Sequence, residues 1–201
     1  MTGRETERPG PSRVATLGSL IGMAAMALPW LTVRSSRLAA GEDVGLLDTA
    51  GIPSSLLIGT LWILVLVGSL RPATRLTTSI LACIGVLILP LSLLTAAIGA
   101  DQLLATAPAV ARASLGGAVW VSLFAGYLVL HFSLSALKDL PHVRRLLMLT
   151  APGLILLLAL LGTFDSLALS TEFAGNEQRL LRETGRHLAL SLGSVSIGAL
   201  I

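Results

Sequence analysis

Long apolar runs alternate with short polar segments along most of the chain. Five of these runs contain no Asp, Glu, Lys or Arg, and they are Val14–Val33, Ile52–Leu70, Leu76–Ile98, Leu115–Leu137 and Leu146–Phe164. Each has about 20 residues, enough for a helix to cross the ~30 Å hydrocarbon layer of a bilayer. Because lipid cannot hydrogen-bond the backbone, we predict that all five runs are transmembrane helices. A sixth run begins near Leu188 and continues to Ile201.

The composition supports a membrane protein and argues against the other classes. Hydrophobic residues make up 54% of the 201 residues and charged residues only 12%, with a mean hydropathy of +0.85. A soluble domain has about a quarter of its residues charged, and a disordered chain has low hydrophobicity. Aromatic residues are 4%, too few for the girdles of an outer-membrane β-barrel. We predict an all-α fold, a polytopic helical membrane protein with five complete transmembrane helices, an amphipathic surface helix and a truncated sixth helix.

Polarity divides the chain into four regions. We expect a flexible cytoplasmic tail at residues 1–12, a five-helix membrane region at 13–164, an extracytoplasmic segment at 165–187 and the start of a further helix at 188–201. Within the third region, Asn176 can cap an amphipathic helix that ends at His187 and lies along the outer membrane surface. A simple extension of the sixth helix is the alternative. A cleavable signal sequence remains an alternative for the first run, although that run exceeds the usual ~7–15 apolar residues.

Charges in the polar segments alternate along the chain. The tail carries a net +1, and the later segments carry −1, +2, 0, +2 and −1 in chain order. Basic residues concentrate in the cytoplasmic loops of membrane proteins. We therefore predict a multi-pass protein of the bacterial cytoplasmic (inner) membrane with its N-terminus in the cytoplasm. The total charge of +3 is spread rather than clustered, so we expect membrane lipid and not nucleic acid as a partner.

Few residues could carry chemistry, and the sequence predicts no enzyme, no cofactor, no metal site and no catalytic residue. It contains no phosphate-binding loop, dinucleotide motif or paired cysteines, and its three histidines are far apart. His131 is the one His, Asp, Glu, Lys or Arg side chain within a complete run. Tyr127 precedes it by one helical turn on the same face. An ionisable group inside a membrane is a functional candidate; the alternative is a neutral His131 bonded to a neighbouring helix.

Small residues recur at the spacing that brings membrane helices together. The three sets are Gly18 and Gly22; Ser92, Ala96 and Ala100; and Ala118, Ser122 and Gly126. Faces of this kind allow close backbone approach. We predict that they pack helices within the chain, with a dimer interface as the alternative.

Two stretches near the end of the chain carry a resemblance to a known family. They are Gly162–Ala174 (GTFDSLALSTEFA) and Arg186–Leu192 (RHLALSL). They resemble the entry to the permease domain of osmoprotectant ABC importers, the glycine betaine/choline-type systems. Ala111–Trp120, and Leu28-Pro29-Trp30 followed by Arg37–Glu42, are similar to the extra N-terminal membrane region of the YehY-like subgroup.

The resemblance implies a transporter made of several chains. These are a cytoplasmic ATPase subunit, a second permease copy and an extracytoplasmic solute-binding protein. The family's E-A-A motif, which contacts the ATPase, does not occur here. The resemblance also implies that residues 188–201 begin the first permease-core helix. No substrate-binding residue of the family can therefore be assigned to a position in this sequence. We expect an N-terminal portion that serves assembly or regulation and does not transport alone. The alternative is a stand-alone membrane scaffold or sensor module without transport activity.

Overall fold

The computed structural model describes residues 12–36 and 38–200, in which six helices and three short strands are found. The helices are α1 (Arg13–Ala25), α2 (Leu46–Ser69), α3 (Arg75–Leu104), α4 (Gly117–Ala136), α5 (Pro141–Leu160) and α6 (Ala168–Leu200). The strands are β1 (Leu31–Arg34), β2 (Glu42–Val44) and β3 (Arg112–Leu115). The tail predicted at residues 1–12 lies outside the described residues except for Ser12, whose side chain caps α1.

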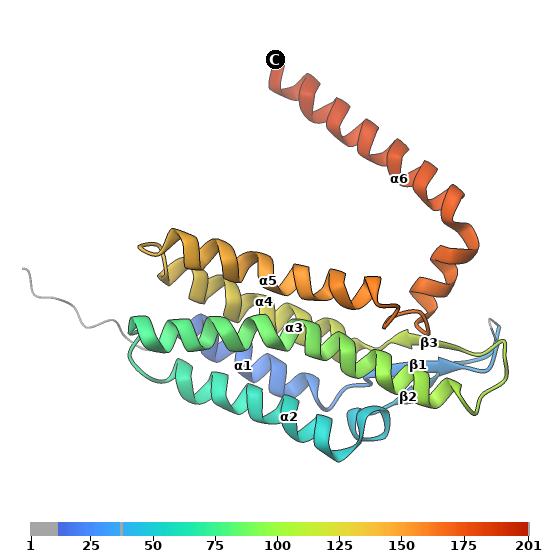
Figure 1. Ribbon diagram of the computed structural model, residues 1–201, viewed down its shortest axis with the longest axis horizontal. Coiled ribbons are helices and arrows are strands. Elements are labelled where there is room, and N and C mark those ends of the chain that lie inside the picture. The colour runs from blue at the N-terminus through green and yellow to red at the C-terminus, as the bar shows by residue number, and fades with distance from the viewer. Residues whose placement is uncertain (1–11, 37, 201) are drawn as a thin grey trace, which may run out of the picture.

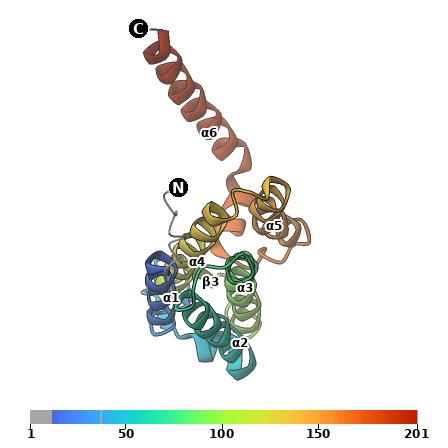
Figure 2. The same ribbon diagram turned by 90° about the vertical axis from the view of Figure 1, so that its left-hand side faces the viewer.

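Helices α1 to α4 form a ring. Each helix packs against the next, and α4 packs against α1 to close the ring, while α5 lies outside it against α3 (Figure 2). The strands lie at one end of this bundle, and α6 projects away from it (Figure 1). The bundle therefore has one end with the sheet and an opposite end where α3 and α5 begin.

Four of the five predicted spans are confirmed by length and hydropathy. Helices α2, α3, α4 and α5 are each long and apolar enough to cross a membrane. They differ greatly in how much of the span the protein itself covers, from 61% of the α3 window to 6% of the α5 window. Helix α3 is thus central, whereas α5 presents almost its whole surface to its surroundings.

The prediction that Val14–Val33 forms one transmembrane helix is wrong. The helix ends after 13 residues at Ala25, and the run continues through a turn into β1. Pro29 lies in this turn, and proline cannot donate the hydrogen bond that a continuing helix requires. The backbone of Trp30 instead accepts from Gly116 and donates to Val44, at 2.9 and 2.8 Å. Hydropathy alone does not separate a full span from a short helix followed by a buried strand.

The all-α fold class also needs correction, because a small antiparallel sheet closes one end of the bundle. Strand β1 lies between β2 and β3, with Thr32 opposite Asp43 on one side and opposite Ser114 on the other. The Thr32 hydroxyl donates to the Asp43 carboxylate at 2.8 Å. Strands of three or four residues carry too little alternation to be recognised in the sequence.

The small residues pack helices together within the chain, as predicted. Gly22 lies against the indole of Trp62, and Gly126 lies against Ile88 and Leu89. A Cβ added to Gly18 would lie 3.0 Å from a side-chain carbon of Val129. The rest of the predicted set is buried, and comprises Ser92, Ala96, Ala100, Ala118 and Ser122. These residues bring α1, α3 and α4 close enough to form the core.

Helix α6 differs from the predicted surface helix. Its backbone leaves helical geometry at Asn176 (φ −135°, ψ 23°) and then continues to Leu200 without a break at His187. The Asn176 side-chain amide donates back to the Glu172 carbonyl at 3.2 Å, and the role of its side-chain oxygen as the cap of the following helix stays a prediction. The part of the helix that follows Asn176 is continuous, which corresponds to the alternative, an extension of the sixth helix.

Candidate functional site

An aromatic stripe follows the outward face of α4. Trp120, Phe124, Tyr127 and His131 are separated by four, three and four residues, which places them on one side of a helix. Their side chains are exposed, with 57%, 56% and 55% exposure for the first three. The opposite face of α4 packs against α1 and α3. We call these four residues the α4 stripe.

The two candidate residues, Tyr127 and His131, lie in contact within this stripe. Their ring centroids are 5.8 Å apart and the ring planes are inclined by 31°. Among the residues that the structure describes, neither side chain makes a hydrogen bond to a neighbouring helix. The pair therefore has polar atoms on a surface that the described part of the chain leaves uncovered.

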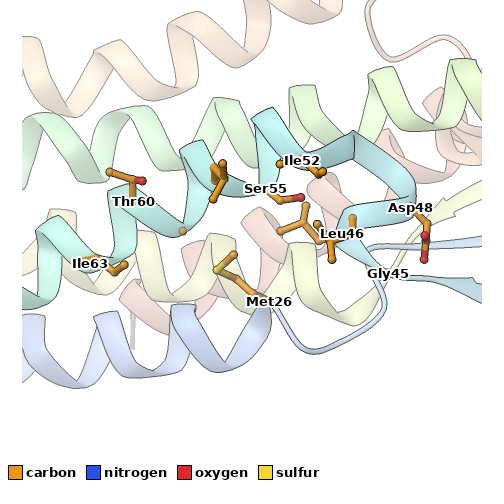
Figure 3. Close-up of a pocket in the computed structure, with 11 residues that line it drawn as sticks. Met26, Gly45, Leu46, Asp48, Ile52, Ser55, Thr60 and Ile63 are labelled. Carbon is orange, nitrogen blue, oxygen red and sulfur yellow. The ribbon is translucent and has the colours of Figure 1, made fainter.

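A groove lies between the end of α1 and α2 (Figure 3). It has a volume of about 510 Å³, and Met26 forms its floor beside Gly59. Asp48 and Gly45 lie at one end and Ile63 at the other. The Ser55 hydroxyl within it already donates to the Gly51 carbonyl at 2.8 Å. This groove is mainly apolar and suits a hydrocarbon chain rather than a reaction.

No grouping of three metal-ligating side chains occurs within residues 12–36 and 38–200. His142 lies at the start of α5 and His187 on α6, and both are exposed. The structure thus brings Tyr127 to His131 but does not bring the three histidines into one site.

Charges differ between the two ends of the bundle. The end where α3 and α5 begin carries Arg13, Arg71, Arg75, Lys138, Arg144 and Arg145. The sheet end carries Glu42, Asp43, Asp48, Asp101 and Asp165, with Arg34 and Arg112. At the basic end, Arg75 lies 3.5 Å from Asp139, with both side chains more than three-quarters exposed. Such an exposed pair contributes little to stability.

Two features were missed in the sequence. The spacing of Trp120 and Phe124 relative to Tyr127 was visible as a helical repeat, and it extends the candidate pair into a stripe. The sequence shows that Lys138, Arg144 and Arg145 are basic. It does not show that they line one cavity, because that depends on the turn before α5.

Comparison with known proteins gives one family match. The family model described as the N-terminal domain of the ABC transporter permease YehY matches residues 8–170. This range contains α1 to α5, the sheet and the first residues of α6. No curated protein matches the chain.

Proposed function

The chain belongs to the family of N-terminal domains of the ABC transporter permease YehY, and on this premise we propose that it is part of the membrane-embedded permease of a binding-protein-dependent importer. The match over residues 8–170 carries this proposal. The four long apolar helices are consistent with a multi-pass protein of the inner membrane. An ATPase subunit and an extracytoplasmic solute-binding protein are the partners that such a permease requires.

The transported solute in this proposal is an osmoprotectant such as glycine betaine or choline. Its support is the resemblance of Gly162–Ala174 and Arg186–Leu192 to the permease entry of osmoprotectant importers. The first stretch covers the turn after α5 and the start of α6. The region from α1 to α5 then precedes the transport pathway and serves its assembly or regulation.

The α4 stripe suits a role in assembly. A tyrosine hydroxyl in hydrocarbon without a partner is unfavourable by a few kcal/mol, and ionisable groups in membranes normally face other protein. Tyr127 and His131 are uncovered by this chain. We therefore assign the stripe as the contact surface for another helix of the permease, and His131 as a neutral residue that hydrogen-bonds across that contact.

Reconstitution tests the proposed function directly. Proteoliposomes with the complete permease, its ATPase and its binding protein should accumulate labelled glycine betaine only with ATP. Proteoliposomes in which residues 1–201 replace the complete permease should accumulate no more than empty vesicles, because this domain precedes the transport pathway. Uptake by residues 1–201 at the rate of the complete permease would contradict the assembly role. Absence of betaine and choline uptake by the complete system would contradict the proposed substrate class.

Orientation is tested by labelling single cysteines in a Cys83→Ser background. We propose that the sheet end faces outward and the basic end inward, because basic residues concentrate in cytoplasmic loops. An impermeant maleimide added to intact cells should label Ser36→Cys, between β1 and β2, and should not label Ala73→Cys, between α2 and α3. Permeabilised cells should show labelling at both positions. Labelling of Ala73→Cys alone in intact cells would reverse the topology.

A further inference from the structure

A basic cavity lies where the chain turns from α4 into α5. Its volume is about 290 Å³, and its walls are Lys138, Pro141, Arg144, Arg145 and Met148. The four residues from α5 are at positions i, i+3, i+4 and i+7, so they share one face of its first two turns. Lys138 comes from the turn before the helix. Three cationic side chains therefore converge on one hollow.

The cations of this cavity have no acidic partner in the described part of the chain. Asp139 is adjacent in sequence to Lys138, but its carboxylate is the one that lies 3.5 Å from Arg75. Lys138, Arg144 and Arg145 are all exposed. The cavity thus concentrates positive charge that neither a neighbouring helix nor the preceding loop neutralises.

An apolar strip continues from the cavity along the same side of α5. Met148 forms the inner wall, and Pro152 and Leu156 follow at intervals of four residues. Met148 and Leu156 are each 60% exposed. The face of α5 that packs against the bundle is a different one, on which Ala151 is buried. A cationic hollow therefore opens directly onto an uncovered hydrocarbon-facing strip.

We propose that this cavity binds the phosphate of an anionic phospholipid, whose acyl chain lies along the apolar strip of α5. Guanidinium groups bind phosphate through paired hydrogen bonds, and the lysine adds a further charge. A phospholipid joins a phosphate to hydrocarbon, and the cavity joins cations to an apolar wall in the same order. An acidic protein segment or a free phosphate would use the cations but leave the strip uncovered. Basic residues beside the end of a membrane helix attract the headgroups of anionic lipids.

Lipid titration of the purified chain in neutral detergent tests the proposal. Thermal stability and native mass spectrometry should both show binding of phosphatidylglycerol in preference to phosphatidylcholine. Each basic residue near anionic lipid changes affinity about fivefold, so Arg144→Gln/Arg145→Gln should weaken phosphatidylglycerol binding about 30-fold. Lys138 lies outside the helix, so Lys138→Gln should not affect helix packing. It should weaken phosphatidylglycerol binding about fivefold, and it tests the site if the double variant does not fold.

Arg13→Gln/Arg71→Gln is the matched control, because it removes the same charge from two exposed residues at the same end of the bundle. It should leave phosphatidylglycerol binding nearly unchanged. Equal losses in both double variants would show diffuse surface attraction and overturn the site. A full response to inorganic phosphate alone, or equal binding of phosphatidylcholine, would also overturn it. Undiminished phosphatidylglycerol binding by Arg144→Gln/Arg145→Gln would overturn it as well.

Discussion

Replacing Gly116 by alanine is expected to destabilise the protein by about 3 kcal/mol, at the upper end of the usual effect of overpacking. An added Cβ would lie 2.7 Å from the carbonyl carbon of Pro29 and 2.8 Å from that of Trp30. Both are backbone atoms, so no side-chain rotation can relieve the clash. The Gly116 backbone itself has ordinary extended dihedrals (φ −77°, ψ 171°). The requirement for glycine is thus one of space.

Two hydrogen bonds depend on this close approach. Gly116 donates to the Trp30 carbonyl and Ala118 donates to the Pro29 carbonyl, each at 2.9 Å. They connect the start of α4 to the turn between α1 and β1. A shift that accommodates the methyl group would lengthen both bonds at once. The substitution therefore weakens the junction that joins the sheet to the bundle.

Gly117 provides a control one residue away. A Cβ at this position would meet nothing within 4 Å, and Gly117 is the first residue of α4. Gly117→Ala should therefore leave stability unchanged or raise it slightly, because alanine favours a helix over glycine. In detergent, thermal unfolding of Gly116→Ala should occur about 10 °C lower than that of the wild type. Equal unfolding temperatures for the two variants would contradict the close approach of Pro29.

The same junction explains where sequence-based prediction of the fold failed. Helices α2 to α5 were predictable because length and hydropathy suffice to define a buried or lipid-covered helix. The run that starts at Val14 is equally apolar, but Trp30 and Leu31 are buried by β2, β3 and α3 rather than by lipid. Apolar composition does not distinguish these two environments. Pro29 was a local signal against a continuing helix, but Pro90 and Pro152 lie inside helices that do continue, so a proline alone does not mark a helix end.

The candidate site was partly predictable for a similar reason. Helical spacing alone placed Tyr127 beside His131, since both belong to one regular element. It could not show that α1 and α3 take the opposite face and leave the pair uncovered, because that depends on which helices are neighbours. The groove at Met26 and Gly59 likewise arises from the packing of α1 on α2. The spacing of residues along one helix could be predicted from the sequence, whereas the arrangement of the helices around one another could not.

A photo-crosslinking amino acid at Tyr127, introduced into the complete permease in cells, is expected to give a strong protein adduct. The α4 stripe is proposed to contact another permease helix, and a probe within it would then lie within reach of protein rather than lipid. The matched position is Leu64 on α2, whose side chain is 48% exposed on a helix that packs against α1 and α3. We expect at least about a tenfold excess of protein adduct at Tyr127, since lipid-facing positions meet protein only transiently.

Substitutions of His131 test how much one hydrogen bond contributes to this contact. If its imidazole hydrogen-bonds across the contact, His131→Leu should weaken assembly by the ~1–2 kcal/mol typical of one such bond in a membrane. His131→Gln keeps a hydrogen-bonding group and should recover most of the assembly, measured as the yield of complete permease after purification. The two variants share the exposed position, so a purely steric role would affect both alike. The assembly role would be contradicted if Tyr127 gave adducts with lipid and none with protein, and if both His131 variants assembled equally well. The stripe would then face lipid.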